Sequence, residues 1–218
     1  NAFEGGVGGL GKSKPITGVT FANPDLITDP SSISTPGTYN AEIIGPDGIT
    51  VLLSFYAVWP MLKSAGIESR DLANAESSFV QVATKPSYVN VNVNADAVLG
   101  TSITLKKQFF VDSILGQTGK FGMYGTPTDV KVSKVESSSS SSSSSKNVNV
   151  NSSLYLLTFT TLTPGMREID RKAYVSTKII GDGVYMLVVG TALSRFKGQE
   201  DLLRKVADSF EIVEAPKS

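Results

Sequence analysis

Apolar positions in the last third of the chain first follow the period of strands. Residues 154–164 and 170–193 alternate or run apolar and are rich in β-branched and aromatic side chains, which predicts three successive strands. Gly181, Asp182 and Gly183 provide the residues that a tight hairpin between the last two strands requires. The end of the chain therefore predicts an antiparallel arrangement.

The apolar period then changes to that of a helix. Between residues 194 and 213 the apolar side chains recur at i, i+1, i+4, i+5 and i+8, and so share one helix face: Leu202, Leu203, Val206, Ala207 and Phe210. The segment 195–198, Arg-Phe-Lys-Gly, is expected just before this helix. Strands followed by a helix with one buried face predict an α+β fold, with an antiparallel sheet flanked by helices in an α/β/α sandwich.

The middle of the chain predicts further strands and one helix. Strand-like patterns cover residues 49–58, 78–84, 88–94 and 128–135, and a polar loop is expected over 63–77. Apolar positions between Ile103 and Leu115 fall on one helical face. Thr101 or Ser102 is placed as the N-cap of this helix, and Gly116 is placed for a left-handed residue at its end.

Glycine and proline divide the chain into an arm and a folded domain. Both are frequent in residues 1–47, which we expect to be extended, because glycine loses the most backbone entropy on ordering and proline removes a hydrogen-bond donor. The α+β domain is expected over residues 48–214. Within it, residues 137–153 are rich in serine and asparagine, cannot bury apolar area and are predicted to form a solvated loop insertion.

The arm has two interpretations: a flexible tail, or a segment that becomes ordered on a partner. Apolar side chains are spaced along it, with Phe3 and Leu10 as the expected anchors, and Lys12 and Lys14 add positive charge. A purely solvating tail would carry more charge and fewer aromatic residues. The pattern therefore favours partner binding.

Composition narrows the possible functions. The chain has 218 residues, 20 of them basic and 20 acidic, so it lacks the basic excess typical of nucleic-acid-binding proteins. No apolar run reaches the roughly 18 residues that a membrane-spanning helix needs. Without cysteine or histidine the chain has no thiolate nucleophile, disulfide or imidazole base. The start at Asn1, without a signal-like apolar segment, favours a mature, targeted protein.

The sequence motifs that could indicate catalysis or ligand binding are weak. Residues 6–13 satisfy the phosphate-binding pattern G-x-x-x-x-G-K-[ST], but no strand precedes them, and Pro15 follows where a helix should continue. Asp25 and Asp29 could offer oxygen atoms to calcium, although aspartate beside proline is more typical of turns. No Gly-x-Ser-x-Gly motif occurs, and the plentiful serine–lysine neighbours single out no dyad. We therefore expect no enzyme, cofactor or metal.

Five short patterns in the C-terminal third together resemble a known family. They are Tyr-Leu-Leu-Thr-Phe in one strand, Arg171 opening the next, Gly-Asp-Gly-Val-Tyr at the turn, Arg-Phe-Lys before the helix and Val-Ala-Asp-Ser-Phe at its end. Their order and spacing from Leu154 to Val213 resemble the C-terminal half of the PsbP and PsbP-like proteins of the photosynthetic thylakoid lumen.

The resemblance implies a non-catalytic extrinsic subunit in the chloroplast thylakoid lumen, peripheral to the membrane on the lumenal face of a photosystem. Photosystem II is the first expectation. There the protein would stabilise the oxygen-evolving centre or its peripheral subunits by docking on the photosystem core and other lumenal subunits. Arg195 and Lys197 would form a basic rim for acidic lumenal loops, the alternative being a helix entry with solvated bases.

Other readings stay open at this point. A photosystem I-associated subunit and a lumenal assembly factor would share the fold, and an α+β ligand-binding or Ran-binding-like domain would have no photosynthetic role. Members of the family have been associated with calcium or manganese through histidine and carboxylate positions. Because this chain has no histidine, that property does not carry over.

We predict that the phosphate-binding look-alike at residues 6–13 does not bind nucleotide, because it lacks the strand and helix that would hold the loop. Calorimetric titration with ATP and magnesium should give no saturable heat. A micromolar isotherm that disappears in Lys12→Ala would instead make this an NTP-binding protein.

Overall fold

The structure, a computed structural model, describes residues 19–22, 36–62, 66–71, 73–74, 76–89, 104–116, 119–122, 125–135, 151–163 and 165–216. Several predictions lie outside these residues. They concern the arm over residues 1–18, Asp25 and Asp29, the strand beyond residue 89, and the serine tract.

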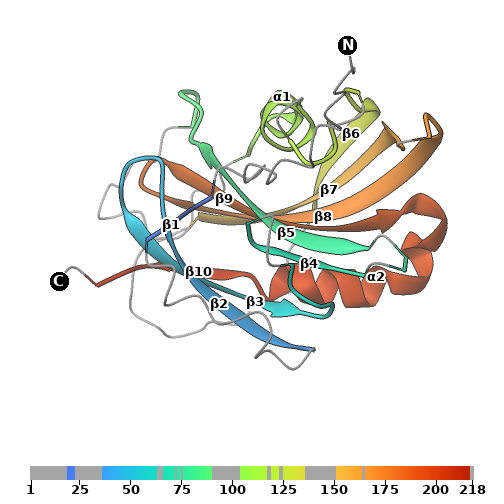
Figure 1. The fold of residues 1–218 in the computed structure, drawn as a ribbon. Helices are drawn as coiled ribbons and strands as arrows, with labels where there is room; N and C mark the ends of the chain where they lie inside the picture. Colours follow the sequence, from blue (N-terminus) through green and yellow to red (C-terminus); the bar gives the residue numbers. More distant parts are fainter. Residues whose placement is uncertain are drawn as a thin grey trace, which may run out of the picture.

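Two antiparallel sheets make up the described part of the chain (Figure 1). The small sheet has the order β1-β2-β3-β10 and contains β1 (Thr20–Phe21), β2 (Gly37–Ile44), β3 (Thr50–Ala57) and β10 (Glu211–Glu214). The large sheet has the order β4-β5-β9-β8-β7-β6 and contains β4 (Glu68–Arg70), β5 (Ser77–Thr84), β6 (Thr128–Val135), β7 (Asn151–Leu162), β8 (Glu168–Ile180) and β9 (Gly183–Ala192).

Helices cover the large sheet sparingly. The helix α1 (Lys107–Phe110) continues directly into the π-helix η2 (Val111–Leu115), and α2 (Leu193–Asp208) follows β9. Figure 1 shows α1 on one side of the large sheet and α2, with the small sheet, on the other. The prediction of antiparallel sheet with helices is confirmed, but the α/β/α sandwich is wrong: on one face of the large sheet a second sheet packs beside α2.

The large sheet separates two apolar cores. One core lies between the two sheets and α2, and the other lies between the large sheet and the α1–η2 segment. Strand β9 serves both, because successive side chains of a strand point to opposite faces. Its residues alternate between the cores, with Tyr185, Leu187 and Val189 in the first and Val184, Met186 and Val188 in the second.

Asp47 joins the turns of two hairpins. Its Oδ1 accepts the amide of Ile49 at 3.1 Å within the β2–β3 turn, and its Oδ2 accepts the amide of Asp182 at 2.8 Å in the β8–β9 turn. Gly181 adopts a φ of +56° in that second turn, a conformation that glycine adopts without strain, as predicted for the tight hairpin. Lys85 also reaches this turn, with Nζ 3.0 Å from Asp182 Oδ1. The two sheets are therefore held together by polar contacts at this end as well as by the core.

The strand predictions in the C-terminal third are confirmed as β7, β8 and β9, and those for residues 49–58, 78–84 and 128–135 as β3, β5 and β6. Four strands were not predicted. β1 and β2 lie in the range expected to be an arm, β4 lies in the expected polar loop, and β10 follows the last helix. Residues 151–153, expected in the loop insertion, belong to β7.

Both helix predictions need correction in their bounds. α2 begins at Leu193, so the 195–198 segment lies within the helix rather than before it. Leu203, Val206 and Ala207 are buried as predicted, but Phe210 lies beyond the helix end, where it still enters the core. The middle helix spans only α1 and η2. Its N-cap is Lys106, so the prediction of Thr101 or Ser102, which lie outside the described residues, is wrong, and Gly116 is extended rather than left-handed, with a φ of −65°.

We predict that Phe210→Ala destabilises the protein by about 3–5 kcal/mol, because truncating a buried phenylalanine removes apolar contacts and leaves a cavity. Phe210 is 1% exposed in the core between the sheets and α2. Leu193→Ala, at an apolar side chain that is 41% exposed, is the matched control and should change stability little. Equal midpoints for the two variants in thermal unfolding would show that Phe210 is not part of the core.

Candidate functional site

Four basic side chains gather at the end of the large sheet where α2 begins. Strand pairing sets Arg70 opposite Ser77 and Arg171 opposite Ala192, the residue that precedes α2. Arg195 lies in the first turn of that helix, and Lys120 comes from the segment that follows η2. We call Arg70, Lys120, Arg171 and Arg195 the basic cluster.

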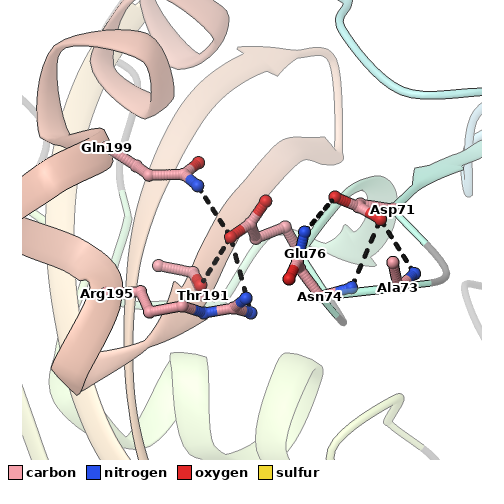
Figure 2. Close-up of polar contacts among 7 residues, drawn as sticks. All are labelled: Asp71, Ala73, Asn74, Glu76, Thr191, Arg195 and Gln199. Carbon is pink, nitrogen blue, oxygen red and sulfur yellow. Dashed lines mark hydrogen bonds and ion pairs between the residues drawn. The ribbon is translucent and has the colours of Figure 1, made fainter.

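Arg195 is anchored by a buried carboxylate (Figure 2). Glu76 is 2% exposed, and its Oε1 lies 3.4 Å from Arg195 Nη2. The same oxygen accepts hydrogen bonds from Gln199 Nε2 at 2.8 Å and from Thr191 Oγ1 at 3.5 Å. These three donors satisfy a buried charge that would otherwise cost several kcal/mol. Glu76 thus ties the segment before β5 to the end of β9 and to the first two turns of α2.

A short turn beside Glu76 adds a negative charge at the surface. Asp71 accepts the amides of Ala73 and Asn74 at 2.8 and 3.2 Å through Oδ1, and the side-chain amide of Asn74 at 2.9 Å through Oδ2 (Figure 2). These hydrogen bonds, with a smaller contribution from Arg195, lower the pKa of Asp71. Asp71 therefore stays ionised and places a negative charge beside Arg195 of the basic cluster.

Lys120 is the most deeply placed member of the basic cluster. Its side chain is 16% exposed, forms an ion pair with Glu68, and places Nζ 4.6 Å from the ring centroid of Phe79. Burial lowers the pKa of Lys120 to about 8, while Glu68 opposes the shift and Arg70 and Arg171 add to it. The site therefore holds a lysine whose charged form is only moderately favoured near neutral pH.

Arg171 stacks on the same aromatic group. Its guanidinium carbon lies 5.7 Å from the centroid of Phe121, which itself contacts Phe79 and Phe159. Its Nε donates a hydrogen bond to Thr161 Oγ1 at 3.0 Å. Burial lowers the pKa of Arg171, and the charges of Arg70 and Arg195 lower it further. An arginine stays protonated regardless, so the shift records first the burial of the guanidinium and then its repulsion by the neighbouring like charges.

The four basic side chains of the basic cluster form ion pairs with only two described carboxylates. Glu68 pairs with Lys120 and Glu76 pairs with Arg195, but in the described part of the chain no carboxylate forms an ion pair with Arg70 or Arg171. Both of these side chains are half-buried and keep access to solvent. Guanidinium groups present a planar fork of donors that matches a carboxylate or phosphate. The arrangement is thus suited to bind an anionic group from outside the chain.

The structure brings only one of the predicted partner-binding residues into this site. Arg195 belongs to it but is already paired with Glu76, which removes much of its charge from the surface. Lys197 is exposed on α2. Phe3, Leu10, Lys12 and Lys14 lie outside the described residues. Their roles stay predictions.

Sequence reasoning missed Arg70, Lys120 and both buried glutamates. Glu68 and Arg70 were assigned to a polar loop, although they form β4 beside β5. The one available signal was Arg171, which was predicted to open a strand; in the structure β8 begins earlier, at Glu168. Nothing in the linear pattern links Arg171 to Lys120 and Arg70, which lie about 50 and 100 positions earlier.

Two further findings concern the described residues alone. They include no group of three or more aspartate, glutamate, histidine or cysteine side chains that could hold a metal ion. Among the helices described, none is both long and apolar enough to span a membrane.

Comparisons with known proteins concern the fold. No family model matches the chain, and no curated protein matches it. Among solved structures, cyanobacterial PsbP (CyanoP) from Synechocystis sp. PCC 6803 is similar, with 15% identity, 84% of this chain and 96% of that chain covered, and a TM-score of 0.41. LpqN, involved in cell envelope biogenesis of Mycobacterium tuberculosis, is similar with 9% identity, 81% and 91% coverage and a TM-score of 0.39.

The first of these structures is a member of the family that the C-terminal residues resemble, and the second is a cell-envelope protein.

We predict that Lys120 titrates near pH 8, well below an exposed lysine, because burial disfavours its charged form. The Cε resonance of Lys120 in ¹³C-labelled protein should report this, with assignment by Lys120→Arg. Glu68→Gln should lower the Lys120 pKa further, since it removes the one charge that favours the ammonium form. In the unmodified protein, between pH about 8 and 10.5, folded Lys120 binds fewer protons than Lys120 of the unfolded chain. The free energy of unfolding therefore increases as pH rises through this range. A Lys120 midpoint near 10.5 would show that the side chain is solvated.

Proposed function

We propose that this protein is a non-catalytic docking protein that binds an acidic partner surface through the basic cluster. The observation that supports this most is the pair of half-buried guanidinium groups, Arg70 and Arg171, which face each other's charge without a carboxylate from the described chain. Repulsion of this kind is relieved when an external carboxylate binds between them. A partner carboxylate therefore gains more here than at an isolated surface arginine.

The rigidity of the surroundings favours binding over catalysis. Arg171 is held by Thr161 and Phe121, and Arg195 is held by Glu76. Because these side chains are already ordered, docking costs little further side-chain entropy. The arrangement offers charge and geometry but pairs no base with a nucleophile. Its chemistry is that of recognition.

For the biological setting we propose an extrinsic subunit on the lumenal side of a photosystem, most directly photosystem II. The support is the resemblance of residues 154–213 to PsbP-like proteins, together with Arg171, which belongs both to that resemblance and to the basic cluster. Acidic lumenal loops of the photosystem would supply the carboxylates. A photosystem I-associated subunit or a lumenal assembly factor would use the same chemistry and is the alternative.

We predict that Arg70→Gln combined with Arg171→Gln weakens binding to salt-washed photosystem II membranes about tenfold, because two charge-assisted contacts to partner carboxylates are lost. Binding of the unmodified protein should also fall as salt rises, since exposed charges are screened over about 8 Å at physiological ionic strength and about 3 Å at 1 M. A sedimentation assay with labelled protein measures both effects.

Two variants serve as controls for this prediction. Lys107→Gln removes one charge from the exposed side of α1, away from the basic cluster, and should bind as the unmodified protein does. Arg171→Lys keeps the charge but loses the planar fork, and should retain only part of the affinity. Undiminished binding by the double variant, with an unchanged thermal midpoint, would exclude the basic cluster as the docking site. Failure of the protein to co-purify with any photosystem from solubilised thylakoids would exclude the proposed setting.

A further inference from the structure

The outer face of the small sheet carries half-buried and exposed side chains and has its own chemical character. Its strands alternate regularly, so every second residue of β2, β3 and β10 points away from the core. Strand pairing sets these outward residues in rows, with Glu42, Leu52 and Val213 in one row and Asn40, Ser54 and Glu211 in the next. Together they line a hollow of about 400 Å³. We call this surface the outer groove.

Two exposed apolar side chains lie in the outer groove. Leu52 is 40% exposed and Val213 is 52% exposed, and the two are directly paired across β3 and β10. They are two of only five large apolar side chains exposed in the described part of the chain. Exposed apolar residues that occur singly need no explanation, but a neighbouring pair within a concave surface is typical of a contact site.

The charges around this apolar pair all have one sign. Glu42 and Glu211 are the only charged residues that line the outer groove, and neither forms an ion pair with a described residue. Two lysines are found near the small sheet: Lys205 places its Nζ 5.0 Å from the ring centroid of Tyr56, and Lys178 is half-buried. Lys178 does interact electrostatically with Glu211, so Glu42 is the less compensated of the two carboxylates.

We propose that the outer groove docks an extended cationic segment of a partner protein, with an apolar side chain on the Leu52–Val213 pair and a base on each glutamate. The two glutamates are separated by two strand spacings across the sheet and two residues along it, or about 12 Å between their Cα atoms. In an extended segment, bases four residues apart lie on the same side about 13 Å apart, with one side chain of that side between them. A basic–x–apolar–x–basic pattern therefore matches the groove in charge, spacing and periodicity.

This surface is separate from the basic cluster. The outer groove faces away from the core between the two sheets, whereas Lys120, Arg171 and the phenylalanines they contact lie on the opposite face of the large sheet. The two surfaces have opposite charge and lie on opposite sides of the molecule. The protein can thus hold an acidic partner and a basic partner at the same time.

The test uses the full chain and a capped synthetic peptide, Thr-Lys-Thr-Val-Thr-Lys-Thr, titrated into ¹⁵N-labelled protein. Amide resonances of β3 and β10 should shift, and the same peptide with glutamate in place of lysine should cause no shift. Glu42→Gln with Glu211→Gln should weaken binding about fivefold, because each exposed ion pair contributes a factor of two or three. Leu52→Ser should weaken it as well. The proposal is overturned if the double variant binds equally or if the shifts map to another surface.

Two further measurements make the result unambiguous. Asp112→Asn with Glu168→Gln changes the net charge equally at exposed sites outside the groove and should leave binding unchanged. Lys12→Gln with Lys14→Gln in the full chain should leave the amides of β3 and β10 unshifted. If that variant moves them, the groove is occupied by residues of this same chain, and a partner segment is not its ligand. None of these outcomes depends on Arg70 or Arg171, so failure here leaves the docking function of the basic cluster untouched.

Discussion

Every residue of β9 from Gly183 to Val189 is buried, because one face of this strand lies in the core shared with the small sheet and α2 and the other lies in the core beneath α1 and η2. A strand buried on both faces must be apolar at nearly every position and cannot slip in register without exposing one set of side chains. The pairing of β9 with β5 and β8 therefore sets where both neighbours end. The positions of α2 and of the basic cluster both follow from this register.

The end of β9 is where the apolar interior gives way to charge. Thr191 points toward α2 and contacts Glu76, a carboxylate that only the convergence of β5, β9 and α2 can keep buried. The hydrogen bonds to Glu76 fix the first turns of α2 against the sheet. Arg171 pairs with Ala192, the next residue after Thr191, and is directed to the other face, where it joins the basic cluster. A charged site at this place is thus a consequence of how the strands terminate.

The two proposed docking surfaces have opposite charge and are compatible with a chain that has no net charge. The 20 basic and 20 acidic residues cancel in total, yet the described structure places guanidinium groups without an ion pair at one end of the large sheet and carboxylates without an ion pair on the small sheet. Local charge of this kind governs encounter, orientation and partner choice. The composition alone argued only against a strongly basic surface, which is a weaker statement than the structure supports.

The sequence by itself determined the strands β3, β5, β6, β7, β8 and β9, the hairpin at Gly181 and the buried face of α2, because each rests on a local period or a turn residue that neighbours in the chain provide. Only the tertiary structure decided the rest. The strands β4 and β10 are short and gain stability from pairing with β5 and β3, not from their own pattern. Of the site residues, the sequence singled out Arg171 and Arg195. In the structure Arg195 forms an ion pair with Glu76, whereas Arg171 forms no ion pair with a described carboxylate. This difference arises from contacts with segments about 100 residues away in the chain. Such contacts leave no periodic trace, since a buried charge is stabilised by the fold around it and not by its sequence neighbours.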